Sequence, residues 1–150
     1  MKLIKAEHDD AQTLWEMQRE AFSELLEKYR DYETSPAAET LERMLQRLSD
    51  GSCFYFIIAD GKKVGALRVI TKDNRKRLSP IFIMKQYRGK GLAQEAIRLA
   101  EQIHGEHDWE LSTILQEQGN CHLYEKLGYR RTGKIERINE RMDIVYYEKD

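Results

Sequence analysis

Two glycines one residue apart, Gly89 and Gly91, stand between an apolar run and an amphipathic helix, and no other feature constrains the fold as much. The run Leu78–Met84 has the composition of a central strand, and apolar residues recur at helical spacing from Leu92 onward. Glycine at both positions lets the backbone turn its N–H groups toward a bulky anion. The positive end of the following helix adds to this preference for negative charge.

The turn has the chemistry of a pyrophosphate-binding loop, because Arg88 and Lys90 add side-chain charge to the amides. An NTP-binding P-loop requires Ser or Thr directly after its lysine, whereas Gly91 and Leu92 follow Lys90 here. A dinucleotide fingerprint requires a third glycine where this chain has Gln94. An ordinary strand-to-helix turn remains the alternative that spacing alone leaves open.

The N-terminal part of the chain predicts a short strand over Lys2–Ala6 and then two helices. Asp9 or Asp10 caps the first helix, whose inward stripe is Leu14, Met17, Ala21 and Leu25. The polar and aromatic segment Tyr29–Ser35 predicts a loop. The second helix is predicted to start with Ser35 as N-cap and Pro36 as first helical residue, and to end at Asp50-Gly51. Its apolar face is Leu41, Met44, Leu45 and Leu48.

The rest of the chain predicts a hairpin, a crossover and a second hairpin. The first hairpin joins Cys53–Ala59 to Val64–Thr71 through Asp60-Gly61, and Lys72–Arg77 is expected to be a solvated basic turn. The helix after Gly91 has Leu92, Ala93, Ala96, Ile97, Ala100 and Ile103 inward. Later elements are a strand over Trp109–Leu115, a helix over Gly119–Leu127 with Gly128 as its C-cap, and strands over Gly133–Ile138 and Met142–Tyr147.

This order of elements predicts an α/β (mixed α+β) domain over residues 1–150, with a mixed sheet and helices on both faces. Lys and Arg number 25 against 26 Asp and Glu, so the net charge of -1 argues against nucleic acid as a partner. The longest apolar run, Cys53–Ala59, is too short to span a membrane, and the N-terminus has no signal-peptide pattern. Cys53 and Cys121 fit no metal or redox spacing. We therefore expect free thiols in a cytoplasmic protein.

Two segments carry a resemblance to a known family. Gln86-Tyr87-Arg88-Gly89-Lys90-Gly91 resembles the cofactor signature of the GNAT superfamily of N-acetyltransferases, which follows that family's fourth strand. Leu123-Tyr124-Glu125-Lys126-Leu127-Gly128-Tyr129 resembles the segment after its fifth strand. The two motifs stand at the expected separation, and the element order agrees over nearly the whole chain.

The resemblance implies a mostly antiparallel sheet of six to seven strands, splayed between strands 4 and 5, and acetyl-CoA as cosubstrate. Its pantetheine arm would pair with the backbone of Phe82 and Ile83, since an opened parallel pair leaves amides that a ligand can bond. Its pyrophosphate would lie on the amides of Arg88 to Leu92. The residues expected to bind the cofactor are Phe82, Ile83, Gln86, Tyr87, Arg88, Gly89, Lys90, Gly91, Leu92, Ala93 and Asn120.

Tyr124 corresponds to the family's usual general acid. A phenol with a pKa of about 10 can protonate a leaving thiolate whose conjugate acid has a pKa of roughly 8.5. A packing tyrosine is the alternative. Many relatives carry an Asn seven residues earlier, where this chain has Glu117, and Asn120 can take that role from the next turn or serve as a helix cap.

The resemblance leaves the general base and the acceptor open. Several relatives have a Glu on the fourth strand, which this chain lacks, and the remaining candidates are Glu110, Glu20, Glu24 or a chain of waters. The loop Tyr29–Ser35 is where relatives usually admit the acceptor, a small-molecule or peptide amine. No metal is expected, and a homodimer through the terminal hairpin is open. The rival hypothesis is a CoA-binding sensor or structural module without activity.

Overall fold

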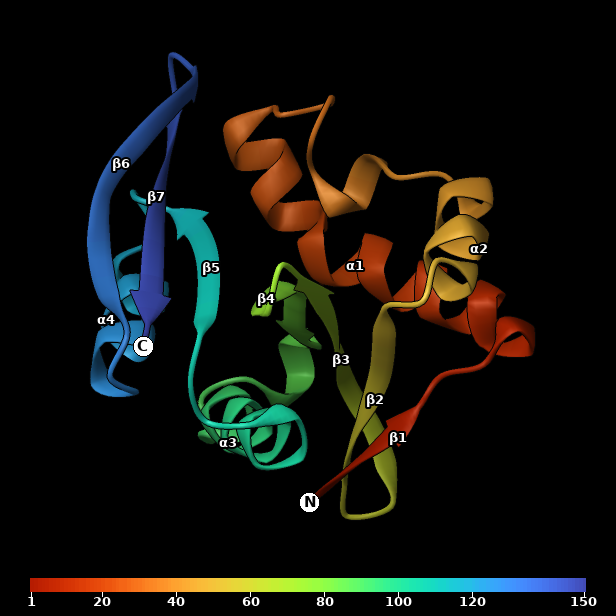
Figure 1. Cartoon of the computed structure of the whole chain (residues 1–150). Coiled ribbons are helices and arrows are strands. Elements are labelled where there is room, and N and C mark those ends of the chain that lie inside the picture. The colour runs from red at the N-terminus through yellow and green to blue at the C-terminus, as the bar shows by residue number, and fades with distance from the viewer.

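In the computed structural model, which describes residues 1–150, seven strands form one sheet in the order β1-β2-β3-β4-β5-β7-β6 (Figure 1). All neighbouring strands are antiparallel except β4 and β5, which confirms the predicted mixed sheet. The strands are β1 (Lys2–Lys5), β2 (Cys53–Ala59), β3 (Lys62–Lys72), β4 (Arg75–Ile83), β5 (Trp109–Ile114), β6 (Arg130–Asn139) and β7 (Met142–Lys149).

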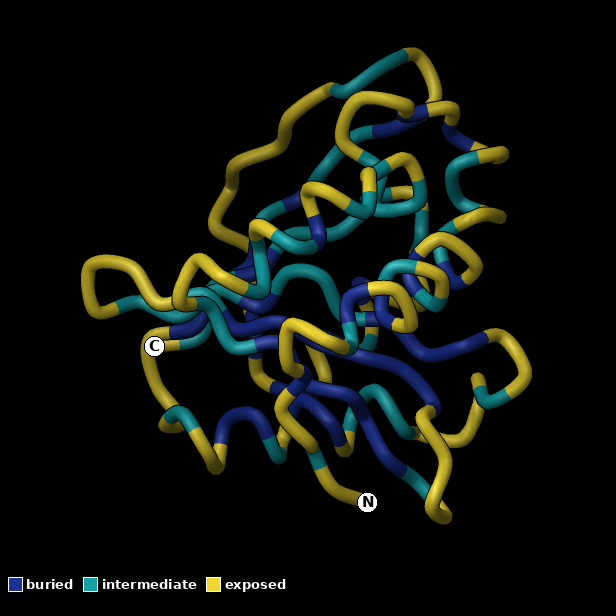
Figure 2. Tube along the Cα trace, turned by 90° about the vertical axis from the view of Figure 1, so that its right-hand side faces the viewer, coloured by how far each residue is buried: buried dark blue, intermediate teal, exposed yellow.

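Helices cover both faces of the sheet, and each face has its own core. The helices are α1 (Ala11–Tyr29), α2 (Leu41–Ser49), α3 (Leu92–His104) and α4 (Gln118–Lys126), with short 3-10 turns at His8–Asp10, Pro36–Ala38 and Lys85–Tyr87. In β2 the side chains of Tyr55 and Ile57 join the core under α3 and α4, while Phe54 and Phe56 join the core under α1 and α2. This alternation follows from the two-residue period of a strand that is buried on both sides. Figure 2 shows the buried trace along the middle of the sheet and exposed loops around it.

The splay that positions the site lies between β4 and β5. These strands pair only at Lys76↔Trp109 and Arg77↔Glu110. Beyond Arg77, β4 remains paired with β3 as far as Ile83 but has no strand partner on its other side. The gap between β4 and β5 therefore opens along the second half of β4, as expected.

The charge of the segment Lys72–Arg77 predicted a solvated loop. The structure instead has a hairpin here, which joins β3 to β4. Lys72 pairs with Arg75, and Asp73 and Asn74 form the two-residue turn with φ of 53° and 64°. Asn and Asp tolerate such left-handed backbone, and turns of this kind match the twist of the strands they join. The ends of β3 and β4 next to this turn carry charged side chains, so their composition does not resemble that of a strand.

Three other expectations about helices differ from the structure. Ser35 does cap a helical turn by accepting a hydrogen bond from the Ala37 amide, but that turn ends at Ala38. The α-helix begins separately at Leu41, with Thr40 accepting from the Arg43 amide. In α3 the side chain of Ile103 is 55% exposed rather than buried. The first helix has Asp10 at its N-cap without a side-chain cap, and the Asp10 carboxylate accepts from the Glu7 amide instead.

The C-terminal strands are longer than predicted, and β7 lies between β5 and β6. The hairpin therefore docks through its second strand, and β6 forms an edge of the sheet. No helix of this chain is long and apolar enough to cross a membrane.

Candidate active site

A groove runs from the glycine turn to the splay. It has a volume of about 620 Å³ and is walled by α1, the end of β4, the start of α3 and α4. We call it the glycine groove. Its lining includes Phe82, Ile83, Tyr87, Arg88, Gly89, Gly91, Leu92, Ala93, Gln94, Asn120 and Tyr124. Of the predicted cofactor-binding residues, Gln86 and Lys90 do not line this groove and are exposed.

The glycine turn presents a row of unused backbone donors. The Arg88 amide bonds the Lys85 carbonyl, and the next amide with an acceptor in the protein is that of Glu95, which bonds Gly91. No hydrogen bond within the protein uses the amides from Gly89 to Gln94. Backbone donors without a partner at a helix N-terminus fit a phosphate group, so the turn passes the chemical test for a pyrophosphate site.

The two glycines are required by backbone conformation. Gly89 and Gly91 have φ of +80° and +75°, and a Cβ placed on either would meet no atom within 4 Å. Open space above a left-handed backbone is where a ligand can approach most closely.

The Arg88 side chain makes two hydrogen bonds within the protein. Its guanidinium donates to the carbonyls of Ile83 and Ala21, both at 2.8 Å. It therefore ties α1 to the end of β4. Because carbonyl oxygens are neutral, the guanidinium keeps its charge, and Arg88 also lines the glycine groove, so its contribution to anion binding stays a prediction. The Arg88 amide, however, already bonds the Lys85 carbonyl. The unused amides begin one residue later, at Gly89.

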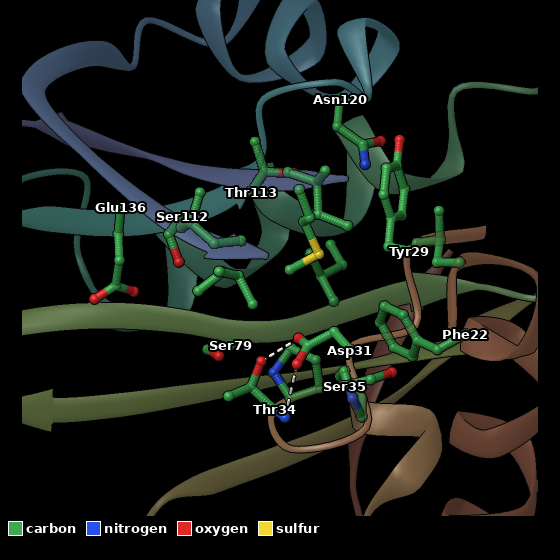
Figure 3. Close-up of a pocket in the computed structure, with 18 of the residues that line it drawn as sticks. Phe22, Tyr29, Asp31, Thr34, Ser35, Ser79, Ser112, Thr113, Asn120 and Glu136 are labelled. Atoms are coloured by element: carbon green, nitrogen blue, oxygen red, sulfur yellow. Dashed lines mark hydrogen bonds between the residues drawn. The ribbon is translucent and has the colours of Figure 1, made fainter. Parts of the chain in front are cut away.

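A second cavity lies on the α1 side of the splay and has a volume of about 350 Å³. We call it the splay cavity. Figure 3 shows Ser112 and Glu136 reaching into it from the β5–β7–β6 part of the sheet, and Asp31, Thr34 and Ser35 on the facing wall. The segment after α1 therefore contributes to the cavity as expected, but Tyr32 and Glu33 do not line it.

Tyr124 lies where the two spaces meet, because it lines both. It is one of five shared residues, the others being Phe22, Leu25, Ile81 and Asn120. Tyr124 belongs to α4, and its side chain packs in the core on the face of the sheet that α3 and α4 cover. The residue is only 7% exposed, and its hydroxyl makes no hydrogen bond within the protein. Burial raises the pKa of Tyr124 to about 12. This group therefore keeps its proton at neutral pH.

Glu117 is engaged by two residues of α1. The Tyr29 hydroxyl donates to its carboxylate at 2.5 Å, and Lys28 Nζ lies 2.8 Å away. Burial by itself would raise the pKa of Glu117, but these hydrogen bonds and the Lys28 charge hold it below its usual value. The carboxylate therefore stays ionised and already has partners, whereas the Asn120 side chain is free to face both spaces.

None of the three carboxylates considered as a base lines the splay cavity. Glu110 lies beside Arg75 and Arg77 at the paired end of β4 and β5. Glu24 lines the glycine groove and pairs with Lys85, and Glu20 lines an open groove on the outer side of α1. The carboxylates that do line the cavity are Asp31 and Glu136.

Sequence reasoning did not single out Glu136, Ser112 or Gln94. Gln94 follows the glycines by one helical turn, so its place could have been inferred from the start of the helix. Ser112 on β5 and Glu136 on β6 point to the cavity side of the sheet, and the side chains of a strand alternate between its two sides. This period of two predicts a face but not which strands are neighbours.

The site combines free backbone amides at a helix N-terminus with a groove along the open edge of β4, and comparison with known proteins shows the family of the chain. Residues 11–129 match the model of the Acetyltransferase (GNAT) family. The chain therefore belongs to the acetyltransferase (GNAT) family. A stretch of 91 residues is 30% identical to N-acetylaspartate synthetase of Danio rerio, covering 57% of this chain and 32% of that protein. The aligned part is thus about a third of the length of that relative.

Solved structures share the fold at low identity. The PaiA N-acetyltransferase of Thermoplasma acidophilum, in complex with coenzyme A, is 18% identical with a TM-score of 0.70, over 99% of this chain and 98% of that one. The ribosomal-protein-S18-alanine N-acetyltransferase of Escherichia coli is 14% identical with a TM-score of 0.77, over 97% and 90%. At these identities the likeness concerns the fold.

Proposed function

We propose that this enzyme transfers the acetyl group of acetyl-CoA directly to a primary amine held in the splay cavity, and that Tyr124 acts as the general acid. The observation that carries the proposal is the position of Tyr124, which is shared by the glycine groove and the splay cavity and has an unbonded hydroxyl. A donor in one space and an acceptor in the other would meet at this residue.

The glycine groove would hold the cosubstrate. The amides from Gly89 to Gln94 would bind the pyrophosphate, and the positive end of α3 would favour its charge. The edge of β4 at Phe82 and Ile83 has no strand partner across the splay and would pair with the amides of the pantetheine arm. Asn120, rather than the engaged Glu117, would contact that arm. Acetyl-CoA would supply the activated acetyl thioester and leave as the CoA thiol.

The residues of the chain would direct one bond exchange. The amine nitrogen forms a bond to the acetyl carbon, the carbon–sulfur bond breaks, and Tyr124 gives its proton to the sulfur. The amine loses a proton to water, and Tyr124 regains one from solvent. Because the neutral phenol persists up to its raised pKa, the donor is present across the neutral range.

The acceptor is expected to be a small-molecule or peptide amine. This rests on the volume of the splay cavity, about 350 Å³, and on its lining by side chains from α1, α4 and strands β4 to β7. Free Cys53 and Cys121 suit a reducing compartment, and we expect the enzyme to act in the cytoplasm.

The proposal is tested by release of the CoA thiol from acetyl-CoA in the presence of a panel of primary amines. Acetylated product that forms only with both substrates, and initial rates that fit a ternary complex, are the expected results. Tight binding of acetyl-CoA without turnover of any amine would favour a CoA-binding sensor. Acetylation of the protein itself during turnover would contradict direct transfer.

A further inference from the structure

The splay cavity contains two carboxylates without a cationic partner. Asp31 is only 7% exposed, and its carboxylate accepts hydrogen bonds from the Thr34 amide and hydroxyl, both uncharged groups. Glu136 also lines the cavity but remains exposed to solvent, and its carboxylate accepts a hydrogen bond from the Tyr146 hydroxyl at 3.3 Å. Neither carboxylate forms an ion pair with a Lys or Arg side chain, although such pairs occur in many other parts of the chain.

The one cation that lines the cavity is already balanced. Arg77 donates to the Ser112 hydroxyl at 2.8 Å, and its guanidinium lies 4.0 Å from Glu110. Glu110 also lies beside Arg75, which in turn lies 3.9 Å from Glu148. These two arginines and two glutamates form a group without net charge, and Arg77 forms no ion pair with either cavity carboxylate.

The carboxylates lie apart in a cavity in which 12 of the 23 lining residues are hydrophobic. Glu136 lies at one end of the cavity in Figure 3, Asn120 and Tyr29 lie at the other, and Asp31 is on the wall between them. The surfaces between these polar groups suit methylene groups; they come from Leu25, Leu26, Pro36, Pro80, Ile81, Ile114, Ile138, Met142 and Ile144.

We propose that the acceptor is a slender aliphatic amine with at least one further cationic group, held by Asp31 and Glu136 while its terminal amine reaches Tyr124. The inference rests on the proposed function, because it assigns the acceptor to the splay cavity. A second ammonium would supply the counter-charge that both carboxylates lack, and a flexible chain would cover the apolar walls.

The test compares straight-chain α,ω-diamines with alkylamines and ω-amino acids of the same carbon number. We expect kcat/KM for the best diamine to exceed that of its matched alkylamine by about tenfold, and the ω-amino acid to be the poorest. The preference should weaken as salt is added, because screening reduces attraction between charges that retain solvent contact.

Two variants connect the preference to the cavity. Glu136→Gln and Asp31→Asn should each reduce the ratio of diamine to alkylamine kcat/KM by roughly threefold or more. Asparagine retains an oxygen for the Thr34 amide, so the loop is expected to keep its turn. Glu140→Gln, which removes an exposed carboxylate outside the cavity lining, is the matched control and should leave the ratio unchanged.

Equal kcat/KM values for diamines and alkylamines would overturn the inference while leaving amine acetylation in place. An unchanged ratio in both cavity variants would do the same. Calorimetry of a diamine with the protein gives a second measurement that does not depend on turnover. Binding that is lost in Glu136→Gln supports the cationic site even if no amine is acetylated, and absence of binding to the unaltered protein contradicts it.

Discussion

The hydroxyl of Tyr29 donates a hydrogen bond of 2.5 Å to Glu117, and this bond joins the last residue of α1 to the residue that precedes α4. It crosses the side of the molecule where β4 and β5 have separated. Lys28 reinforces it from α1, and Asn139 donates to the Tyr29 carbonyl at 2.9 Å from the end of β6. The two parts of the sheet, which share few strand contacts, are thus tied together beside the site.

Removal of this bond should loosen both substrate sites together. Tyr29→Phe keeps the ring but leaves Glu117 without its hydroxyl donor, at a cost of about 1 kcal/mol in the free energy of unfolding. Because Tyr29 lines the splay cavity and Glu117 lines the glycine groove, we expect KM to rise for both acceptor and acetyl-CoA. Steady-state kinetics and denaturant unfolding provide the measurements. Tyr32→Phe, in the adjoining exposed position, is the control and should change neither.

A side chain at Gly91 should impair cosubstrate binding without removing the fold. Gly91→Ala adds a Cβ to a left-handed backbone, at a cost of roughly 1–2 kcal/mol, and places it above the unused amides. Calorimetry with CoA should detect a loss of more than about tenfold in affinity. Gly61→Ala has nearly the same φ, +74°, in a distant hairpin turn and also meets no neighbouring atom. It should lose similar stability but retain full affinity, and equal losses in both variants would argue against the binding role of the turn.

Tyr124→Phe should separate proton donation from packing. The ring remains, and its edge contacts with Tyr129 and Tyr147 are retained, so stability should change little. Loss of the general acid should lower kcat by about 10²–10⁴-fold at neutral pH. The affinity for acetyl-CoA should stay within a few-fold. A thioester with a more acidic thiol should lose less rate, and unaltered kcat under conditions where chemistry limits turnover would exclude the assignment.

His104 should make the protein less stable in mild acid. Burial first, and the Lys76 charge second, lower the pKa of His104 below its usual value. The unfolded chain therefore takes up a proton at higher pH than the folded one. The contribution of the neutral ring is complete above about pH 6.5 and is lost as pH falls from there through the folded pKa. The Tyr55 hydroxyl lies 2.9 Å from Nε2, and a neutral ring can accept a hydrogen bond from this hydroxyl.

The measurement is urea unfolding over this pH range in the unaltered protein and in His104→Gln, which cannot titrate. We expect the free energy of unfolding to fall less steeply toward acid pH in the variant. His122→Gln, at an exposed position, should follow the unaltered protein. Identical acid dependence in the His104 variant would show that this ring does not contribute.

Several elements could be predicted because neighbouring residues determine them. Asp60-Gly61 closes the first hairpin where its left-handed backbone requires such residues, and β2 begins and ends where predicted. The spacing of Gly89 and Gly91 predicted the turn before α3, and the apolar period predicted the buried face of that helix up to Ala100. Each of these features follows from a few consecutive side chains and the backbone angles that they favour.

The expectation of a solvated loop at Lys72–Arg77 was wrong because it considered only the charge of the segment and not the pairing of β3 with β4. The residues Lys72 and Arg75 belong to a hairpin although both are charged, because their strands continue inward into buried positions and carry the outer residues into register. The helix expected from Ser35 stops after one turn, at Ala38. Thr40 caps a new helix whose Met44 side chain packs under α1 and the sheet.

By itself the sequence determined the order of the elements, the glycine turn and the segment that carries Tyr124, since each is encoded in local spacing. Only the tertiary structure decided which distant residues meet. The Glu117 carboxylate bonds Tyr29, 88 residues earlier, a contact that no local spacing predicts. Asp31 and Glu136 line one cavity because β7 lies between β5 and β6 and α1 ends above the splay. Such meetings depend on strand order and helix docking, which are set by burial of the whole core and leave no signature in any short stretch of sequence.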